Sequence, residues 1–304
     1  MSNPPVRRGL YVPSAYWAAP SRNFRSSTRL HLQHYLWQNT TKFLLEPRIR
    51  TSIEQRKQVK IADLGCGNGA WLADLDNELS QKYISAQLNG YDINELNFPP
   101  PAFLPGSITL TKLDVLSERL PMEAIGAFDV VHIRAFSSII INNNTMNLLS
   151  TALALLKPGG WIQWEEWGTD LIIEPASPQL STVSCEKIAR VLKVGGDAQG
   201  LNVDFVRELD RHLIKAGFQQ VFIREDMKRK QDYKGWTEDF LIIWEEVASF
   251  FPSRGETPQE SVTKESWAQL FADAVKETEQ GVALHRGSVF TAIGRKPFHT
   301  GQRS

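Results

Sequence analysis

Three glycines at alternate positions follow a single acid where the chain reads D-L-G-C-G-N-G, from Asp63 through Gly65 and Gly67 to Gly69. Glycine takes positive φ at little cost and lets the backbone come close to a ligand, so this spacing predicts a tight turn with a molecule lying on it. A helical pattern begins at Ala70, and the free amides of a helix N-terminus favour polar or negative groups. Glycine turns of this kind bind nucleotide-like ligands in several folds.

Two further acids stand near the ends of the next two apolar runs. Asp92 lies in the run 87–93, and Asp114 lies in the run 108–115. In nucleotide-binding α/β folds an acid in this place holds ribose hydroxyls, which makes Asp92 a candidate binding residue. The competing interpretation is a glycine turn with two incidental aspartates at strand ends.

Polar side chains also gather on a later apolar run, residues 128–136. Because side chains alternate along a strand, His132 and Arg134 lie on one side near its carboxyl end, where ligands of open α/β sheets bind. His132 is a candidate catalytic residue or, alternatively, a hydrogen-bonded core histidine that shapes the pocket. Arg134 is expected to anchor a carboxylate or close the pocket, because its guanidinium does not give up a proton.

Glu165 and Glu166 interrupt the apolar run 161–167. Glutamates on a central parallel strand are costly without a partner, so both are expected at the mouth of the strand. Glu165 is a candidate general base or amine-binding residue. The alternative is a salt bridge from these glutamates to a neighbouring helix.

The elements that position these residues alternate between strand and helix patterns, which predicts an α/β fold with a largely parallel sheet. Pro47 is expected to end the first helix, which Ser26 or Ser27 would cap, and Asn144 is expected to cap the third. The expected strands are 60–64, 87–93, 108–115, 128–136, 161–167, 220–225 and 289–294, and the expected helices are 28–46, 70–83 and 144–157.

Two stretches outside this alternation carry helical stripes rich in aromatic residues, and together they are expected to form a lid. The glycine-rich segment 195–200 is expected to separate two helices. The predicted organisation is an N-terminal arm and helix at 1–50, a binding core at 51–169, helical lid segments at 170–216 and 228–287, a core strand at 217–227, and a last strand and tail at 288–304.

The 304 residues carry 34 Lys and Arg against 34 Asp and Glu, so no general field attracts nucleic acid or an anionic membrane. The best basic run, 228–230, is expected to be a solvated turn. Two cysteines are too few for a disulfide scaffold, and neither they nor the histidines have metal-site spacing. With no long apolar run, the sequence predicts a soluble, cytoplasmic protein without a metal or a membrane partner. It leaves the oligomeric state open.

Together the glycine turn, Asp92 and the Leu113-Asp114-Val115 segment resemble the S-adenosylmethionine (SAM) site of class I methyltransferases. The resemblance narrows to fungal methyltransferases of secondary metabolism, the group of the gliotoxin-type thiol and amine methyltransferases and relatives of a global regulator. It rests on Tyr11-Val12-Pro13, on the 29–37 segment R-L-H-L-Q-H-Y-L-W, and on L-K-P-G-G at 156–160. It implies a Rossmann-like seven-stranded sheet whose last strand is antiparallel.

The resemblance also implies how SAM is held. Gly65 and Gly67 would line its methionine part, Asp92 the ribose and Asp114 the adenine. Arg29 would pair with the methionine carboxylate, or else it caps the surface. The cofactor-binding residues expected in this way are Tyr11, Arg29, Gln33, Asp63, Gly65, Gly67, Asp92, Ile93, Asp114, Val115 and Arg134, and the candidate catalytic residues are His132, Glu165 and His34.

The implied activity is methyl transfer from SAM to N, O or S of a small, largely apolar natural product, by in-line displacement. One departure from the family is the absence of acidic residues at 14–17 and 26–28, which alters the entrance. This departure and the aromatic lid motivate two alternatives. One is a cyclase or pericyclase that uses SAM without methyl transfer, and the other is a regulatory binding protein.

Overall fold

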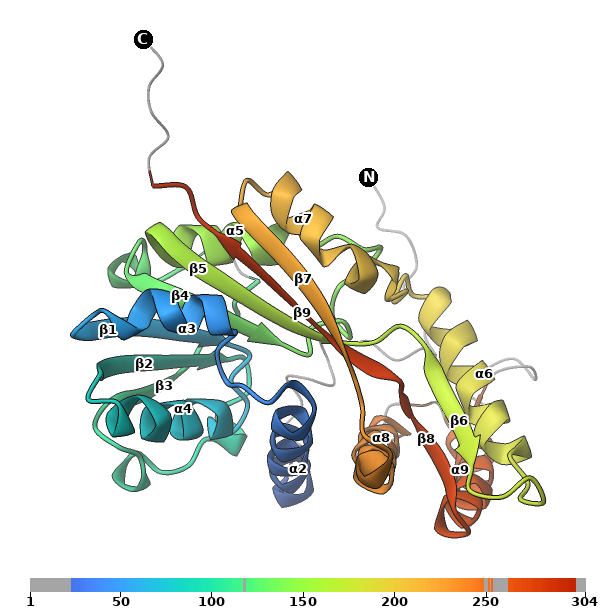
Figure 1. Ribbon diagram of the computed structural model, residues 1–304. Helices are drawn as coiled ribbons and strands as arrows, with labels where there is room; N and C mark the ends of the chain where they lie inside the picture. Colours follow the sequence, from blue (N-terminus) through green and yellow to red (C-terminus); the bar gives the residue numbers. More distant parts are fainter. Residues whose placement is uncertain (1–22, 117–118, 249–250, 252, 254–261, 299–304) are drawn as a thin grey trace.

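The computed structural model describes residues 23–116, 119–248, 251, 253 and 262–298. Its main sheet has seven strands in the order β3-β2-β1-β4-β5-β9-β7 (Figure 1). The strands are β1 Gln58–Leu64, β2 Ser85–Asp92, β3 Ile108–Lys112, β4 Phe128–Arg134, β5 Leu156–Trp167, β7 Gln219–Met227 and β9 Ser288–Arg295. The first five run parallel, while β9 pairs antiparallel with both β5 and β7. The predicted fold class, with its antiparallel last strand, is confirmed.

Helices cover both faces of this sheet. The helices α3 Pro47–Glu54 and α4 Ala70–Gln81 pack on one face, and α5 Met146–Leu155 and α7 Leu209–Lys215 pack on the other. The predicted stripe of α4 is buried through Trp71, Leu72, Leu75 and Leu79. The chain order reverses between β1 and β4, which are parallel neighbours at the centre of the sheet and end at the same side. In such sheets ligands bind beyond the carboxyl ends of the strands at this point.

Several predicted boundaries were wrong. The helix α2 spans Phe24–Thr41 rather than 28–46: the side chain of Asn23 caps its start, and Lys42 ends it with a φ of 67°. Pro47 does not end a helix but opens α3, where its missing N–H costs nothing. Thr145, not Asn144, is the N-cap position of α5. The Pro158-Gly159-Gly160 run lies at the start of β5 rather than after a helix.

The two aromatic stretches build a small layer of their own, which we call the insert. It consists of the antiparallel pair β6 Leu171–Pro175 and β8 Val282–Arg286, with α6 Val183–Asp197, α8 Tyr233–Val247 and α9 Lys264–Glu279. Figure 1 shows β5 leading into β6 and β8 leading into β9, so the insert continues the main sheet beyond its strand ends. The β6-β8 pair was not predicted, and α6 runs through Gly195 and Gly196 to Asp197.

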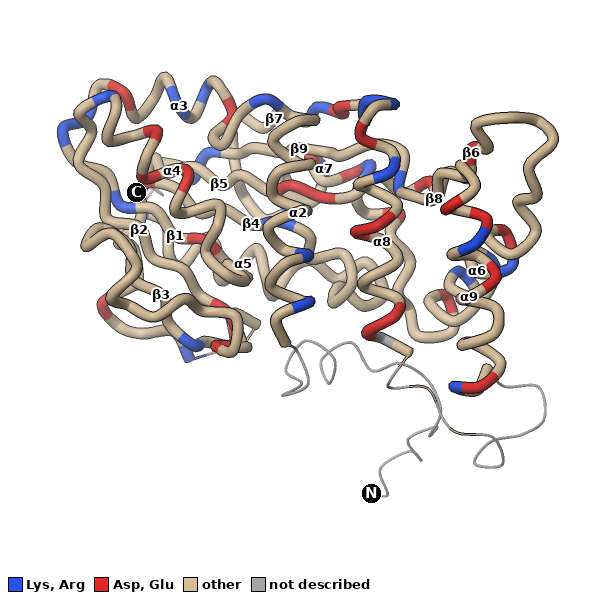
Figure 2. Tube along the Cα trace, turned by 90° about the horizontal axis from the view of Figure 1, so that it is seen from below, with Lys and Arg blue, Asp and Glu red and all other residues tan. Residues whose placement is uncertain are grey.

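Charges of both signs are interspersed along the trace (Figure 2). Within the described ranges, no helix has the length and apolarity needed to cross a membrane. The same part of the chain holds no group of three or more His, Cys, Asp or Glu side chains that could bind a metal ion.

Candidate active site

A cavity of about 2110 Å³ lies beyond the carboxyl ends of β1, β2 and β4 and extends under the insert. Most of the candidate binding residues line it, although they are far apart in the sequence. Those at the cavity wall are Arg29, Gln33, Asp63, Gly65, Gly67, Asp92, Ile93, Asp114, Val115, His132 and Arg134. Glu165 and His34 are not among the lining residues, and Tyr11 lies outside the described residues.

The glycine turn forms the floor of one half of this cavity. Gly65, Gly67 and Gly69 all have positive φ, of 72°, 57° and 77°. A Cβ added to Gly65 would lie 2.3 Å from Cε2 of Phe136, so both the backbone conformation and the lack of space disfavour a larger residue at this position. The Gly65 amide donates to the Tyr91 carbonyl at 2.7 Å, which ties the turn to the end of β2. The turn therefore has a fixed shape before any ligand arrives.

Asp92 supports the turn from the neighbouring strand. One carboxylate oxygen accepts the Gly67 amide at 2.9 Å and the other accepts the Asn94 amide at 2.9 Å. Asp114 is exposed and accepts the Leu116 amide at 3.0 Å. β3 ends at Lys112, so Asp114 lies in the loop beyond the strand. The prediction that Asp114 lies within the strand was wrong. Both acids face the cavity at the ends of adjacent strands.

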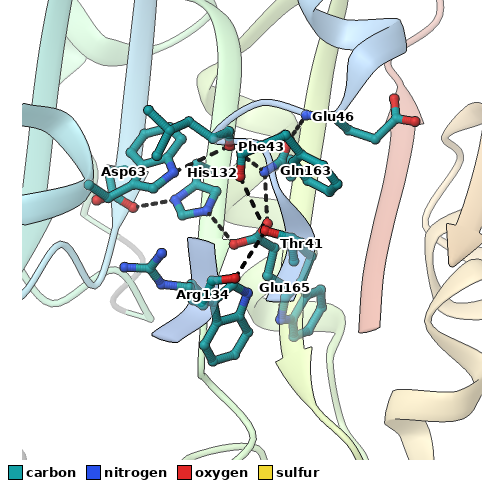
Figure 3. A network of polar contacts seen from close by, with 12 residues as sticks. Thr41, Phe43, Glu46, Asp63, His132, Arg134, Gln163 and Glu165 are labelled. Carbon is teal, nitrogen blue, oxygen red and sulfur yellow. Dashed lines mark hydrogen bonds and ion pairs between the residues drawn. The ribbon is translucent and has the colours of Figure 1, made fainter. Parts of the chain in front are cut away.

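Behind the turn, His132 lies between two buried carboxylates (Figure 3). Its Nδ1 is 2.8 Å from Oδ1 of Asp63, and its Nε2 is 3.3 Å from Oε2 of Glu165. The Trp71 ring stacks on the imidazole at 3.8 Å. Burial lowers the pKa of His132, but the attraction and hydrogen bonds of Asp63 and Glu165 outweigh it, so the pKa is raised. The imidazolium can then donate a hydrogen bond to each carboxylate.

This arrangement favours a structural over a basic role for His132, because both ring nitrogens are engaged. The two glutamates lie near the carboxyl end of β5, as predicted, but they are buried there, with 1% and 0% exposed. Their partners are not helices. Glu165 contacts His132 on the adjacent strand, and Glu166 accepts the Phe136 amide and the Trp164 indole N–H, the latter at 2.9 Å. Burial raises the pKa of Glu166 to about 7.

The same network fixes the chain that follows α2. The Gln163 amide nitrogen donates to the Leu44 carbonyl at 2.9 Å and to Oε1 of Glu165 at 3.1 Å. The Glu46 amide donates to the Gln163 side-chain oxygen at 2.7 Å. These bonds hold segment 42–46 against β5, and α2 is thereby placed across the end of the sheet (Figures 1 and 3).

Arg134, at the end of β4, contacts His34 on α2. The Arg134 guanidinium lies 3.3 Å from Nδ1 of His34 and 5.5 Å from the centroid of the Trp37 ring. Burial and the positive charge of Arg134 lower the pKa of His34 to about 4. Among the described residues Arg134 has no carboxylate within 4.0 Å, although it lines the cavity. It is therefore the cation most available to a ligand in this half.

Arg29 does not cap the surface, since only 1% of it is exposed. Its Nη1 lies 3.7 Å from Oδ1 of Asp239 on α8, and Gln33 also bonds to this carboxylate. Burial raises the pKa of Asp239 to about 6. The N-terminal helix and the insert are thus joined by a buried polar contact at the cavity wall.

The insert half of the cavity has aromatic walls and one unexpected cation. Trp167, Trp236 and Trp244 line it, as does Lys228. Lys228 was expected in a solvated turn, yet only 4% of it is exposed. No local signal distinguishes it from its exposed neighbour Lys230, because the indoles that bury it come from distant parts of the sequence.

No family model matches the sequence. Among curated proteins, the N-methyltransferase tcpN of Claviceps purpurea is 31% identical over 175 residues, which are 57% of this chain and 59% of that protein. The methyltransferase grgD of a Penicillium species is 27% identical over 207 residues, 66% of this chain and 68% of that protein. The chain thus spans less than two thirds of the length of tcpN.

Among solved structures, the plantazolicin methyltransferase BpumL, in complex with a triazolic desmethylPZN analog and SAH, is 14% identical with a TM-score of 0.48. The match covers 94% of this chain and 95% of that one. The sequence relatives agree with the resemblance that the motifs indicated. This chain is similar in sequence to fungal methyltransferases, and its sheet has the strand order and antiparallel seventh strand of the Rossmann-like class I methyltransferase fold.

Proposed function

We propose that the protein is a SAM-dependent methyltransferase that modifies a nitrogen of a small molecule. The observation that carries the proposal is the convergence of four features on one cavity: the glycine turn, Asp92, Asp114 and Arg134, which has no carboxylate within 4.0 Å among the described residues. Several of the curated relatives, tcpN among them, are named N-methyltransferases, which supports nitrogen as the acceptor.

The residues present fit SAM. Gly65 and Gly67 line the cavity, and their positive φ values, 72° and 57°, give the turn a backbone course that residues other than glycine rarely adopt. Asp92 lies at the end of β2 beside the turn and lines the cavity, which is where an acid holds ribose hydroxyls in nucleotide-binding α/β folds. Asp114 is exposed at the next strand end and suits the adenine amino group, beside the side chains of Ile93 and Val115.

The methionine end of SAM needs a cationic partner for its carboxylate and surroundings without excess positive charge for its sulfonium. Arg134 offers guanidinium donors to the carboxylate, with Arg29 close by in α2. Asp63, His132 and Glu165 together carry one net negative charge when the imidazole is protonated, which suits a cationic ligand. When bound, SAM would supply an activated methyl group for direct displacement.

The chain's own contribution to the reaction would be positioning. Holding the acceptor nitrogen in line with the methyl group can be worth roughly 7 to 11 kcal/mol without any base. The aromatic walls contributed by Trp167, Trp236 and Trp244 suit a planar, largely apolar acceptor. A base among the cavity residues is not required for an amine that is already neutral.

Calorimetric titration of the purified protein with SAH tests cofactor binding. We expect tight binding by the wild type and a loss of about tenfold or more in Asp92→Asn, because charged hydrogen bonds to the ribose would weaken. Asp273→Asn is the control, since Asp273 pairs with Lys276 on the outer side of α9. Absence of SAH binding by the wild type would refute the proposal.

Mass spectrometry tests the transfer itself. Products of the wild type with SAM and a panel of aromatic amines should gain one methyl group, with equimolar SAH. Turnover of a substrate with no change in mass would instead favour a cyclisation that needs the cofactor without methyl transfer.

A further inference from the structure

Lys228, directly after β7, places a positive charge in the insert half of the cavity. Its Nζ lies 3.8 Å from the centroid of the Trp236 ring and 4.7 Å from that of Trp167. Cations favour such positions over aromatic faces, so the two indoles hold the side chain in place. Its carbon chain is thereby buried, while the residue still lines the cavity.

Within the part of the chain that the structure describes, this ammonium group has no close anionic partner. In the ranges that the structure describes, no carboxylate oxygen lies within 4.0 Å of Nζ and the side chain makes no hydrogen bond. Burial holds the pKa of Lys228 well below its usual range, and only the more distant Asp239 favours its charge. Asp239 is itself shared with Arg29, 3.7 Å away. A buried cation without a partner is costly, and an incoming anion would remove that cost.

A second cation, Arg286, lines the same region of the cavity. One of its nitrogens donates to the Thr169 carbonyl at 2.7 Å, which leaves further N–H donors of the guanidinium. Asp170, the acid that favours the charge of Arg286, is bonded to Arg207 at the surface. His285 adds no charge near neutral pH, because burial lowers its pKa to about 4. Positive charge therefore exceeds negative charge on this wall.

We propose that Lys228 and Arg286 form a subsite for a carboxylate of the acceptor, with Trp167 and Trp236 flanking its apolar body. This inference rests on the proposed function and narrows its substrate to amines that also carry an acid group. The carboxylate would bind through charge-assisted hydrogen bonds to Lys228 Nζ and to the free donors of Arg286. The acceptor nitrogen would then point toward the other half of the cavity, where the glycine turn lies.

Binding of 2-naphthoate and of its uncharged isostere 2-naphthamide, measured by calorimetry with and without SAH, tests the subsite. We expect wild-type protein to bind the acid about tenfold tighter than the amide, because a hydrogen bond between charged groups is worth more than a neutral one. In Lys228→Met the preference should disappear while the affinity for SAH stays unchanged. Lys230→Met is the matched control, since that side chain is 78% exposed and paired with Glu174.

The wild-type comparison needs no variant, so the test does not depend on the folding of Lys228→Met. Equal binding of the two probes, or binding of the amide alone, would overturn the subsite, as would an unchanged preference in Lys228→Met. No binding of either probe by a protein that binds SAH would overturn it too. A protein that prefers the acid but does not bind SAH would keep the subsite and refute the proposed cofactor instead.

Discussion

The two halves of the cavity are built by different means. In the half under β1, β2 and β4, backbone turns and buried hydrogen bonds fix the wall, and Asp63, His132 and Glu165 lock neighbouring strands together. In the half under the insert, the wall is a cluster of indole and phenyl rings packed around Trp267. Polar networks specify one geometry, whereas apolar packing tolerates changes of shape. Under the proposed function, the polar half would hold the cofactor and the aromatic half the acceptor.

The largest expected effect is on stability: a substitution in the insert should destabilise the insert and leave the main sheet unchanged. Trp267 is 1% exposed in the core of the insert, so Trp267→Ala should destabilise the insert by about 3 to 5 kcal/mol. Hydrogen exchange should accelerate in α6 and α9 and not in β1 or β4, and the affinity for SAH should stay near that of the wild type. Tyr83→Ala is the control, because that ring is 96% exposed. Faster exchange throughout the main sheet would show that the halves are not separable.

The reciprocal change is His132→Gln, which removes a cation between two buried acids. We expect a loss of about 3 kcal/mol or more in the free energy of unfolding, together with weaker SAH binding. Because the folded-state pKa of His132 is raised above 6.5, its contribution is fully present below pH 6.5 and is lost as pH rises through the folded-state pKa. Urea unfolding at several pH values measures this. His212→Gln, at a half-buried histidine bonded to Thr145, should cost about 1 kcal/mol.

Glu166 lies on the face of β5 opposite Glu165, and its titration should change the stability of the protein with pH. Its pKa rises from 4.5 to about 7 on folding, so the folded state binds the proton more tightly. Stability is therefore lost as pH rises from about 4.5 to 7, by up to about 3 kcal/mol relative to Glu166→Gln. Parallel pH profiles for wild type and Glu166→Gln would contradict this.

The smallest expected effect concerns the glycine turn. Gly65→Ala and Gly126→Ala share the same strain, about 1 kcal/mol, because both positions have positive φ. Only at Gly65 does the new Cβ meet a neighbour, Cε2 of Phe136 at 2.3 Å; at Gly126 no atom lies within 4 Å. We expect Gly65→Ala to lower the affinity for SAH by about tenfold and Gly126→Ala to leave it unchanged. Equal affinities in calorimetry would show that the turn does not contact the ligand.

The sequence predicted the polar half better than the insert, for a physical reason. The turn at Gly65 and Gly67 is a local feature, since adjacent residues determine both the positive φ values and the start of the following helix. Asp92 was placed correctly at the end of its strand, and Asp114, although it lies in the loop after β3, faces the same cavity because parallel strands end on one side. Whether these residues bind SAM stays a prediction.

Features that depend on distant partners escaped prediction. Glu165 was expected to act as a base, to bind an amine or to pair with a helix, because nothing in β5 shows that His132 on the adjacent strand will contact it. The strands β6 and β8 are short, and their pairing joins segments more than 100 residues apart. Lys228 was expected in a solvated basic run, because the sequence does not show that Trp236 of α8 covers it.

The central claim is that the turn at Gly65 and Gly67, with Asp92 and Asp114, forms a SAM site. A crystal structure of the protein with SAH tests it most directly. The account predicts the ribose hydroxyls within hydrogen-bond distance of Asp92, the adenine beside Asp114 and the methionine carboxylate at Arg134. SAH bound elsewhere, or an adenosine turned away from both aspartates, would contradict it.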